Sequence, residues 1–444
     1  MYIGFLGACQ FFLTKINESI AIPSLILFLG VGVLLTLKTS FLQIWGIKRA
    51  FRLLMYGDLD RINLNANTLS PVKALFSAMA ATVGMGNIVG PPMAIALGGP
   101  GALFWMLIYI FFGTATKCIE VTFAVYARSI SKEGNVIGGP SQYLRLISPL
   151  LGTWYALLTM ILFGAWSCIQ INTLSCIWAQ EGIPNWISGL VGTSILLFVV
   201  LGGVQRIGNI ASTLVPLKFG LYIFFALLIL GYHYNLLLNA IFLIFECVFT
   251  RPAMCGGLAG AGTLIALRHG VYKSIFITEA GLGTASIAHA LTDAKKPIDQ
   301  GVLAIFSGVA DLILCTISGL LTIVTNVWTT SELSNTLIYQ VFKHYSPFPY
   351  TQYIFLVAIL LFVITALIGN TYNGGQSFAS LVGYKYVPIY YVIVAFISFL
   401  GAFASVPLIW NLLDLMLVFV AVPNLLGVML LAYRYTHVIT DQHK

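Results

Sequence analysis

Charge is scarce in this chain of 444 residues: 8% of the residues are Asp, Glu, Lys or Arg, whereas 59% are hydrophobic. Soluble domains carry about 25% charged residues, so this composition excludes a soluble globular protein. The mean hydropathy of +0.95 favours a single polytopic membrane domain. The net charge of +8 does not indicate nucleic-acid binding, because the basic residues lie in short loops between apolar spans. There they are typical of signals for membrane topology.

Several motifs of other protein classes are also missing. The seven cysteines form no C-x-x-C pair, and no His neighbours a second His or a Glu at the spacing of a metal site. No loop has the G-x-x-x-x-G-K-[ST] pattern of an ATP-driven pump, and no charged rings or repeated filter carbonyls indicate a channel. A polytopic membrane enzyme is an alternative, but it needs a general base or a metal cluster in a polar loop. We therefore expect no enzyme, no cofactor, and no metal beyond a coupling sodium ion.

Apolar windows long enough to cross about 30 Å of hydrocarbon predict about eleven spans. Basic residues gather in every second connecting segment, and only Lys15, Arg251 and Lys343 lie in the opposite set. The positive-inside rule then predicts a multi-pass protein of the cell (inner) membrane, with the N-terminus outside and the C-terminus in the cytoplasm. The approximate spans are 20–38, 73–97, 101–128, 149–179, 184–202, 208–232, 255–276, 301–326, 350–383, 387–406 and 408–433.

Two further apolar stretches are predicted to lie on the membrane surface. Residues 41–55 combine Lys48, Arg49 and Arg52 with apolar side chains, which is typical of an interfacial helix on the cytoplasmic side. Residues 236–249 are too short to span and are followed by Arg251 and Pro252, so we place them at the outer surface.

The most informative stretch is KALFSAMAATVGMGNIVGPPMAIALGGPG at 73–101. Its flanks, 73–82 and 92–97, are predicted to be helical, but its centre contains helix breakers. Freed backbone groups cost several kcal/mol each in hydrocarbon unless they line a cavity, so the break indicates a polar ligand site near the midplane. A kink that serves only helix packing is the alternative. The residues of the predicted break are Gly84, Gly86, Asn87, Gly90, Pro91 and Pro92.

A second glycine-rich stretch, CGGLAGAGT at 255–263, opens a span about five spans later. Two interrupted spans in matching positions indicate an inverted-repeat transporter, although a small-residue packing seam is the alternative. We therefore predict an all-α integral membrane fold. One extra N-terminal helix would precede a ten-helix core of 5+5 inverted repeats, with core helices one and six broken. The predicted units are 1–72 (extra and interfacial helices), 73–234 and 235–434 (the two repeats), and 435–444 (cytoplasmic tail).

A series of ordered motifs carries a family resemblance. The motifs are ATVGMGNIVG with AIALGGPGALFWM (81–106), TKCIE (116–120), GGPSQYL (138–144), CIQINTL (168–174), LGGVQRIGNIASTLVP (201–216), GGLAGA (256–261), ITEAGLGTASIAHA (277–290), DLILCT (311–316) and VPNLL (422–426). With them the chain resembles the alanine or glycine:cation symporter family, which is similar in fold to LeuT-type transporters. The resemblance implies a secondary transporter that imports a small neutral amino acid with sodium by alternating access. The expected partners are this substrate and the lipid bilayer, while the oligomeric state stays open.

The predicted substrate contacts come from the two breaks and two later spans. Glycine lets backbone N–H groups approach a carboxylate, and an amide side chain both donates and accepts. Gln170 and Asn172 are two apart on a helix and face different directions, so one of them is expected to line the site and the other to bond to a neighbouring helix. Gln170 is the favoured one. The resemblance implies Thr, Phe and Trp where this chain has Met85, Leu258 and Asn370, so these departures leave the choice of amino acid open. The full predicted set is Gly84, Met85, Gly86, Asn87, Gln170, Gly257, Leu258, Gly260 and Asn370.

The resemblance also implies an ion site between core helices one and eight, formed by Thr365 and the backbone near Thr82 and Val83. Oxygen ligands of this kind suit a hard cation. Lys218 in core helix five replaces a usually apolar family residue, and an ionisable side chain within a span is functional by default. Its ammonium group would occupy the place of the cation, making transport proton-coupled or ion-independent. Alternatively, Lys218 lies near the cytoplasmic end and snorkels to the interface.

The remaining ionisable residues within spans are predicted to have structural or gating roles. Lys117 and Glu120 are three residues apart on one helix face and are expected to form an ion pair. Asp311 is predicted to anchor helix packing. Glu279 and Gly281, in the glycine-rich segment after core helix six, are predicted to belong to an inner gate or hinge.

Overall fold

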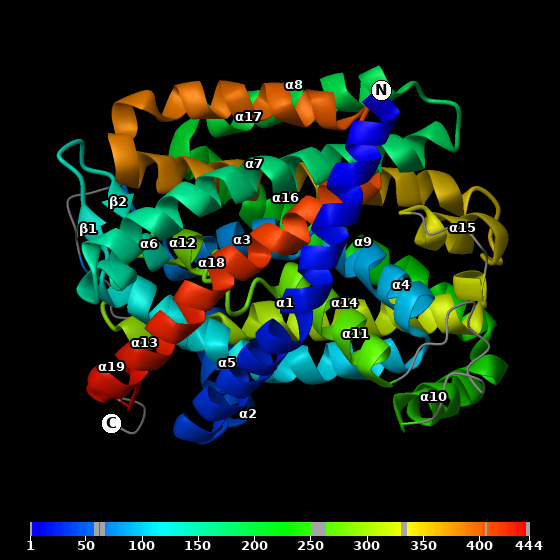
Figure 1. The fold of residues 1–444 in the computed structure, drawn as a ribbon, viewed down its shortest axis with the longest axis horizontal. Helices are drawn as coiled ribbons and strands as arrows, with labels where there is room; N and C mark the ends of the chain where they lie inside the picture. Colours follow the sequence, from blue (N-terminus) through cyan, green and yellow to red (C-terminus); the bar gives the residue numbers. More distant parts are fainter. Residues whose placement is uncertain are drawn as a thin grey trace.

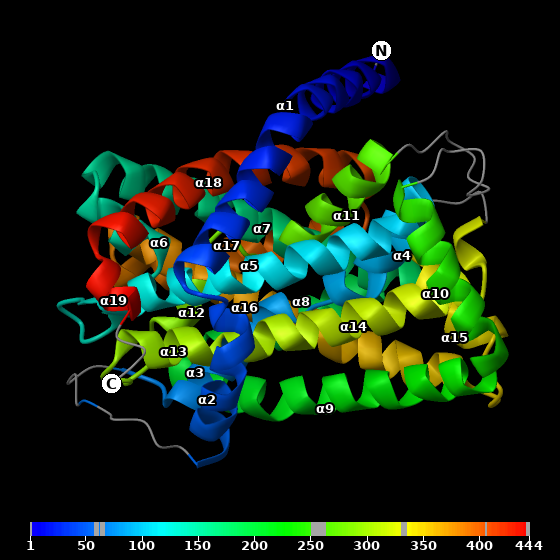
Figure 2. The same ribbon diagram turned by 90° about the horizontal axis from the view of Figure 1, so that it is seen from below.

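Helices make up nearly all of the computed structural model, which describes residues 2–56, 62, 67–249, 263–329, 335–404 and 406–440. The two strands, β1 (Ser129–Ile130) and β2 (Val136–Ile137), pair as a short antiparallel ribbon. Figures 1 and 2 show most long helices lying side by side, with α1 crossing α18 obliquely. The predicted all-α membrane fold is confirmed.

The helices and their bounds are as follows. They are α1 (Tyr2–Lys38), α2 (Leu42–Tyr56), α3 (Pro71–Thr82), α4 (Gly86–Gly98), α5 (Gly101–Tyr126), α6 (Pro140–Tyr143), α7 (Pro149–Ala179), α8 (Asn185–Val200), α9 (Gly203–Tyr232), α10 (Tyr234–Phe249), α11 (Thr263–Thr278), α12 (Ala285–His289), α13 (Pro297–Leu303), α14 (Ile305–Val324), α15 (Leu337–His344), α16 (Thr351–Val382), α17 (Val387–Gly401), α18 (Val406–Arg434) and α19 (Thr436–Thr440). Within the described ranges, short 3₁₀ helices lie at Leu144–Leu146, Val327–Thr329 and Tyr384–Tyr386.

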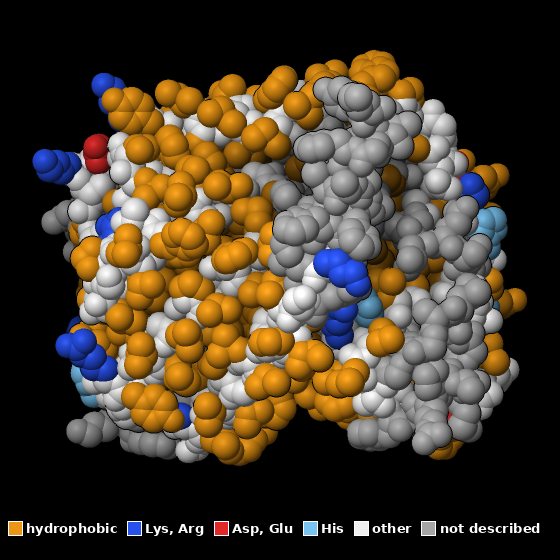
Figure 3. Space-filling view, viewed as in Figure 1, with side chains coloured by type: hydrophobic (Ala, Val, Ile, Leu, Met, Phe, Trp, Pro, Cys, Tyr) orange, Lys and Arg blue, Asp and Glu red, His pale blue; other side chains and the backbone are white. Residues whose placement is uncertain are grey.

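Within the described residues, nine segments are long and apolar enough to cross a membrane. The predicted span 184–202 corresponds to the shorter α8, and 255–276 is described only from Thr263 onward, as α11. The multi-pass expectation is confirmed, whereas the count of eleven and the inverted repeat stay predictions. The predicted first span, 20–38, agrees with the apolar segment Ser19–Lys38, although the helix α1 that contains it already begins at Tyr2. Hydrophobic side chains cover most of the face visible in Figure 3, as expected for a surface in contact with lipid.

The first predicted break is present, but it is narrower than expected. Helix α3 ends at Thr82 and α4 begins at Gly86, while Pro91 and Pro92 lie inside α4, contrary to the prediction. Proline removes a backbone donor, which leaves the carbonyl four residues earlier without its helical partner. For Pro91 that carbonyl belongs to Asn87, and it accepts a hydrogen bond from Ser318 Oγ at 3.1 Å. This tertiary partner allows the helix to continue. The second predicted break, with Gly257, Leu258 and Gly260, lies outside the described residues.

Helix α16 packs against α3, α7 and α9 and so forms one wall beside the break. It approaches α3 closely at Gly369. A Cβ atom added there would lie 2.7 Å from the backbone N and the Cβ of Ala81. Gly369 therefore lets the two helices touch one residue before α3 ends.

We expect Gly369→Ala to lower the free energy of unfolding by about 1–3 kcal/mol, because the added methyl forces α3 and α16 apart. The control is Gly220→Ala on α9, where nothing lies within 4 Å of the added Cβ. That change is expected to stabilise the protein by roughly 0.5–1 kcal/mol, since alanine favours the helix. Unfolding of both purified variants in detergent measures the difference. Equal stabilities would show that α3 and α16 do not need this close contact.

Candidate functional site

A small cavity lies at the break between α3 and α4. Its volume is about 10 Å³, which is close to the minimum for one water molecule, so a larger ligand requires its walls to move. The lining combines residues from α3, α4, α7, α11 and α16 with the segments that follow α3 and α11. The lining residues are Ala81, Thr82, Gly84, Gly86, Trp166, Gln170, Phe276, Ile277, Glu279 and Asn370.

Two aromatic residues that the sequence analysis missed form part of this wall. Trp166 on α7 and Phe276 on α11 meet edge to face, with ring centroids 5.7 Å apart and an interplanar angle of 85°. A Cβ atom at Gly86 would lie 2.9 Å from the Phe276 ring, so the glycine lets the ring approach the start of α4. An aromatic residue within an apolar span gives no local sign that it faces a cavity, which is why neither was predicted.

Two amide side chains provide uncharged polar groups in the wall of the cavity. Gln170 and Asn370 both line it, both are buried, and each has a side-chain oxygen without a hydrogen-bond partner among the described residues. Asn172 instead donates to the carbonyls of Gly401 at 2.9 Å and Ala404 at 2.8 Å. A buried polar atom without a partner is costly, so Gln170 and Asn370 are suited to bind a ligand.

The four predicted contacts in the first break separate into two pairs. Gly84 and Gly86 line the cavity, and Gly86 begins α4, so the positive end of that helix lies at the cavity. Met85 and Asn87 are buried but do not line it. Asn87 accepts a hydrogen bond from the Gly84 N–H at 3.1 Å and donates to Asp311 Oδ1 at 2.7 Å. Its amide therefore shapes the break and is not directed at the cavity.

Lys218 lies near the middle of α9 and is completely buried. Its ammonium group donates to the Val83 carbonyl, which lies in the break, and to Thr365 Oγ1 at 2.5 Å. It also lies 4.9 Å from the centroid of the Phe362 ring. The snorkelling interpretation is therefore wrong, because the charge is far from the end of the helix. The lysine reaches the oxygen atoms that were predicted to hold a cation.

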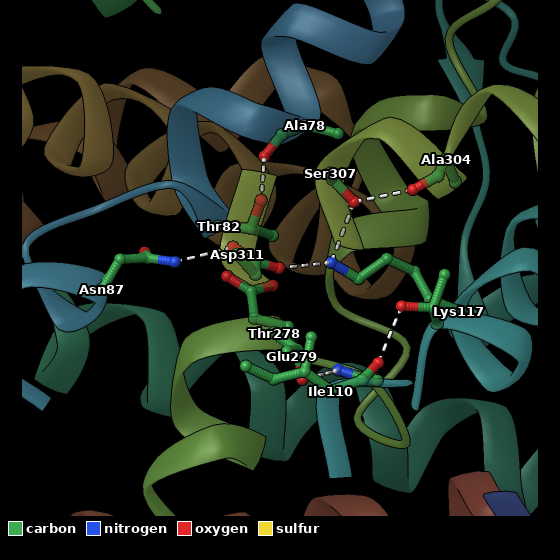
Figure 4. Close-up of polar contacts among 12 residues, drawn as sticks. Ala78, Thr82, Asn87, Ile110, Lys117, Thr278, Glu279, Ala304, Ser307 and Asp311 are labelled. Atoms are coloured by element: carbon green, nitrogen blue, oxygen red, sulfur yellow. Dashed lines mark hydrogen bonds and ion pairs between the residues drawn. The ribbon is translucent and has the colours of Figure 1, made fainter. Parts of the chain in front are cut away.

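The expected ion pair between Lys117 and Glu120 is also wrong. Figure 4 shows Lys117 approaching Asp311, with Nζ 3.4 Å from Asp311 Oδ2 and 3.0 Å from Ser307 Oγ. Glu120 Oε1 instead accepts a hydrogen bond from Asn424 at 2.6 Å. The partner of Lys117 comes from α14, which packs against α5, and helical spacing within α5 gives no information on it.

The segment 279–284 after α11 is buried beside the cavity. Three successive carbonyls accept hydrogen bonds from three helices: Ala280 from Tyr109 (2.8 Å), Gly281 from Asn424 (2.9 Å) and Leu282 from Tyr155 (2.6 Å). Gly281 has a φ of 84°, which glycine adopts without strain. The gating role of Gly281 and Glu279 stays a prediction, but Glu279 has a place in the cavity wall that was not predicted.

An interrupted helix with a cavity at the break, among packed apolar helices, is typical of one class of transporter. The fold is that of LeuT-type secondary transporters, as seen in the similarity to MhsT solved in complex with L-phenylalanine. That likeness has a TM-score of 0.60 at 13% sequence identity and covers 84% of this chain and 90% of that one. It concerns the fold alone.

The family follows from the sequence comparison. The model of the sodium:alanine symporter family matches residues 7–444, and the chain belongs to this family. The sodium/alanine symporter AgcS of Methanococcus maripaludis is 32% identical, over 92% of this chain and 91% of the relative. The probable sodium/glutamine symporter GlnT of Bacillus subtilis is also 32% identical, over 92% of this chain and 85% of the relative. The chain is thus an amino-acid–cation symporter by family and a transporter, not an enzyme.

Proposed function

We propose that this protein imports a small neutral amino acid of the alanine or glycine type across the cell (inner) membrane. Alternating access would expose the cavity between α3 and α4 first to one side and then to the other. The N-terminus outside and the C-terminus in the cytoplasm are part of the proposal. The observation that carries it is a buried cavity lined by both the first residue of α4 and two amides with unpartnered oxygens.

The cavity supports a small zwitterionic substrate for physical reasons. A helix N-terminus favours an anion, so the substrate carboxylate would lie against Gly84 and Gly86. Gln170 and Asn370 would supply hydrogen bonds through side-chain oxygens that no group among the described residues satisfies. Trp166 and Phe276 leave little room, which favours a short side chain. One relative is described as a probable sodium/glutamine symporter, so Asn370 is the position where a larger or more polar substrate would be admitted.

The position of Lys218 supports a mechanism in which its own ammonium group takes the place of the coupling cation. Its ammonium group bonds to Val83 and Thr365, and no carboxylate among the described residues lies within ion-pair distance of it. A sodium ion at the same oxygen atoms would meet a like charge at close range. Proton-coupled or ion-independent transport therefore fits this position. Sodium symport, which the family implies, is the alternative and requires Lys218 to lose its proton or move away.

Uptake of radiolabelled amino acids into proteoliposomes tests both the proposed substrate and the proposed coupling mechanism. We expect alanine or glycine to enter under an inward proton gradient in sodium-free buffer, because Lys218 replaces the sodium ion. Larger neutral amino acids are expected to compete poorly. Uptake that strictly requires sodium would contradict the role of Lys218 but keep the transport function. Failure to take up any amino acid under either gradient would contradict the function itself.

A further inference from the structure

The carboxylate of Glu279 lies in the cavity wall, although nothing in the sequence placed it there. It is 2% exposed, and its Oε2 accepts a hydrogen bond from Thr284 Oγ1 at 2.5 Å. The Glu279 backbone has a φ of 57°, an uncommon conformation for a residue other than glycine. Such conformations persist where the surrounding structure holds them, and they cluster at ligand sites. Here the conformation ends α11 and starts the buried segment 279–284.

No side chain among the described residues forms an ion pair with Glu279. The nearby ammonium of Lys117 is paired with Asp311. Lys218 bonds instead to Val83 and Thr365. A buried carboxylate without a cation is strongly unfavourable, so the cavity is set up to receive a positively charged group or a proton.

The polarity of the cavity indicates which positive group fits. Gly84 and Gly86 bring the positive end of α4 to the same space, where it favours an anion. Glu279 supplies the opposite charge, and Gln170 and Asn370 add neutral donors and acceptors. One small molecule that carries both an ammonium and a carboxylate group can interact with both the Glu279 carboxylate and the N-terminus of α4. A lone sodium ion or proton would satisfy only Glu279.

We propose that Glu279 binds the ammonium group of the substrate and thereby selects amino acids over other small carboxylates. This inference rests on the proposed function, namely that the cavity binds an amino acid. It gives Glu279 a direct substrate contact, in addition to any part in an inner gate. A hydroxy acid of the same shape would leave the Glu279 charge buried without a partner, and the site should reject it.

Matched ligands test this proposal on the unmodified protein. L-alanine and L-lactate share the carboxylate and the methyl group and differ in ammonium against hydroxyl. Trp166 lines the cavity, so intrinsic fluorescence of purified protein in detergent can follow the titration with each ligand. We expect alanine to bind at least about 100-fold more tightly than lactate, the range seen when one partner of a buried charge pair is missing. Affinities within tenfold of each other would overturn the proposal.

Variants of Glu279 then test whether this residue is responsible for the selectivity for alanine over lactate. Glu279→Gln is expected to weaken alanine about 100-fold but lactate less than threefold, so that the selectivity collapses, while Glu279→Asp restores part of it. Equal loss for both ligands, or unchanged alanine affinity, would show that Glu279 is only structural. Glu120→Gln is the matched control. This buried carboxylate bonds to Asn424 and does not line the cavity, so the variant should keep the selectivity ratio.

If Glu279→Gln does not fold, the proposal is decided by Glu279→Asp and by the alanine and lactate affinities of the wild-type protein. Wild-type protein that binds no amino acid would instead refute the proposed function.

Discussion

Replacing Lys218 with methionine is expected to reduce amino-acid uptake at least tenfold and to remove the response of the remaining uptake to a proton gradient. Methionine keeps an unbranched side chain but lacks the ammonium group, so the Val83 carbonyl and Thr365 Oγ1 lose their charged donor. Hydrogen bonds to a charged group contribute about 1.5–3 kcal/mol each, which corresponds to at least tenfold in an equilibrium. Uptake into proteoliposomes with the pH of each side set independently measures the effect.

A smaller side chain at the same position distinguishes charge from shape. Lys218→Ala opens space beside Val83 and Thr365, whose oxygen atoms suit a hard cation. We expect sodium-stimulated uptake to appear in this variant. Lys48→Met on α2 is the control, since Lys48 is exposed and its replacement should leave uptake unchanged. A Lys218→Met variant with the pH and sodium dependence of the wild type would show that Lys218 has no part in coupling.

Both proposed binding positions share the short segment that separates α3 from α4. Lys218 bonds to the Val83 carbonyl, while Gly84 and Gly86, one and three residues later, line the cavity. Two ligands affect each other only if each binds differently in the two states of a shared element. Under the proposed function, the segment Val83–Gly86 is such an element, because its backbone contacts the Lys218 ammonium and lines the cavity proposed for the substrate. Loss of the Lys218 contact is therefore expected to change substrate affinity as well as coupling.

Local sequence signals located the break but not its partners. The glycines at 84 and 86 predict an interruption because glycine is poorly held in a helix, and the structure has it there. The same reasoning placed Pro91 in the break, where it does not lie. The hydroxyl that satisfies the freed Asn87 carbonyl belongs to Ser318, on a helix more than 200 residues away in the sequence. Such a partner follows only from tertiary packing.

The candidate site likewise contains some residues whose position the sequence predicts and others whose position it does not predict. Helical geometry predicts that only one of Gln170 and Asn172 faces the site, and it is Gln170 that lines the cavity. Lys117 was assigned to Glu120 by the same spacing rule, yet its charge meets Asp311 on α14. Glu279 follows a helix end at a positive φ, and no local pattern gives the direction of its side chain. The face of a regular helix on which a residue lies could be predicted, whereas a contact partner from another helix could not.

Breaking the buried ion pair of Lys117 and Asp311 is also expected to have a large effect, in this case on the free energy of unfolding. Asp311→Leu leaves the Lys117 ammonium without its carboxylate, and both residues are almost completely buried. Removing one partner of a buried pair costs about 3–5 kcal/mol, because the remaining charge is uncompensated. We therefore expect this loss in the free energy of unfolding, measured for purified protein in detergent. The Asn87 amide also loses its acceptor, so substrate affinity should fall as the break becomes less ordered.

The double variant Lys117→Met, Asp311→Leu separates the charge from the packing. If the loss comes mainly from the uncompensated charge, removing both charges recovers most of the stability, since apolar replacements of buried pairs are often neutral or stabilising. The control is Glu181→Gln at the exposed pair with Lys343 (2.9 Å), where hydrogen bonds from Tyr339 and Lys343 lower the pKa of Glu181 and keep it ionised at neutral pH. That surface change is expected to cost no more than about 1 kcal/mol. A double variant as unstable as Asp311→Leu would mean that the hydrogen bonds of Asp311, and not its charge, hold α14 against the break.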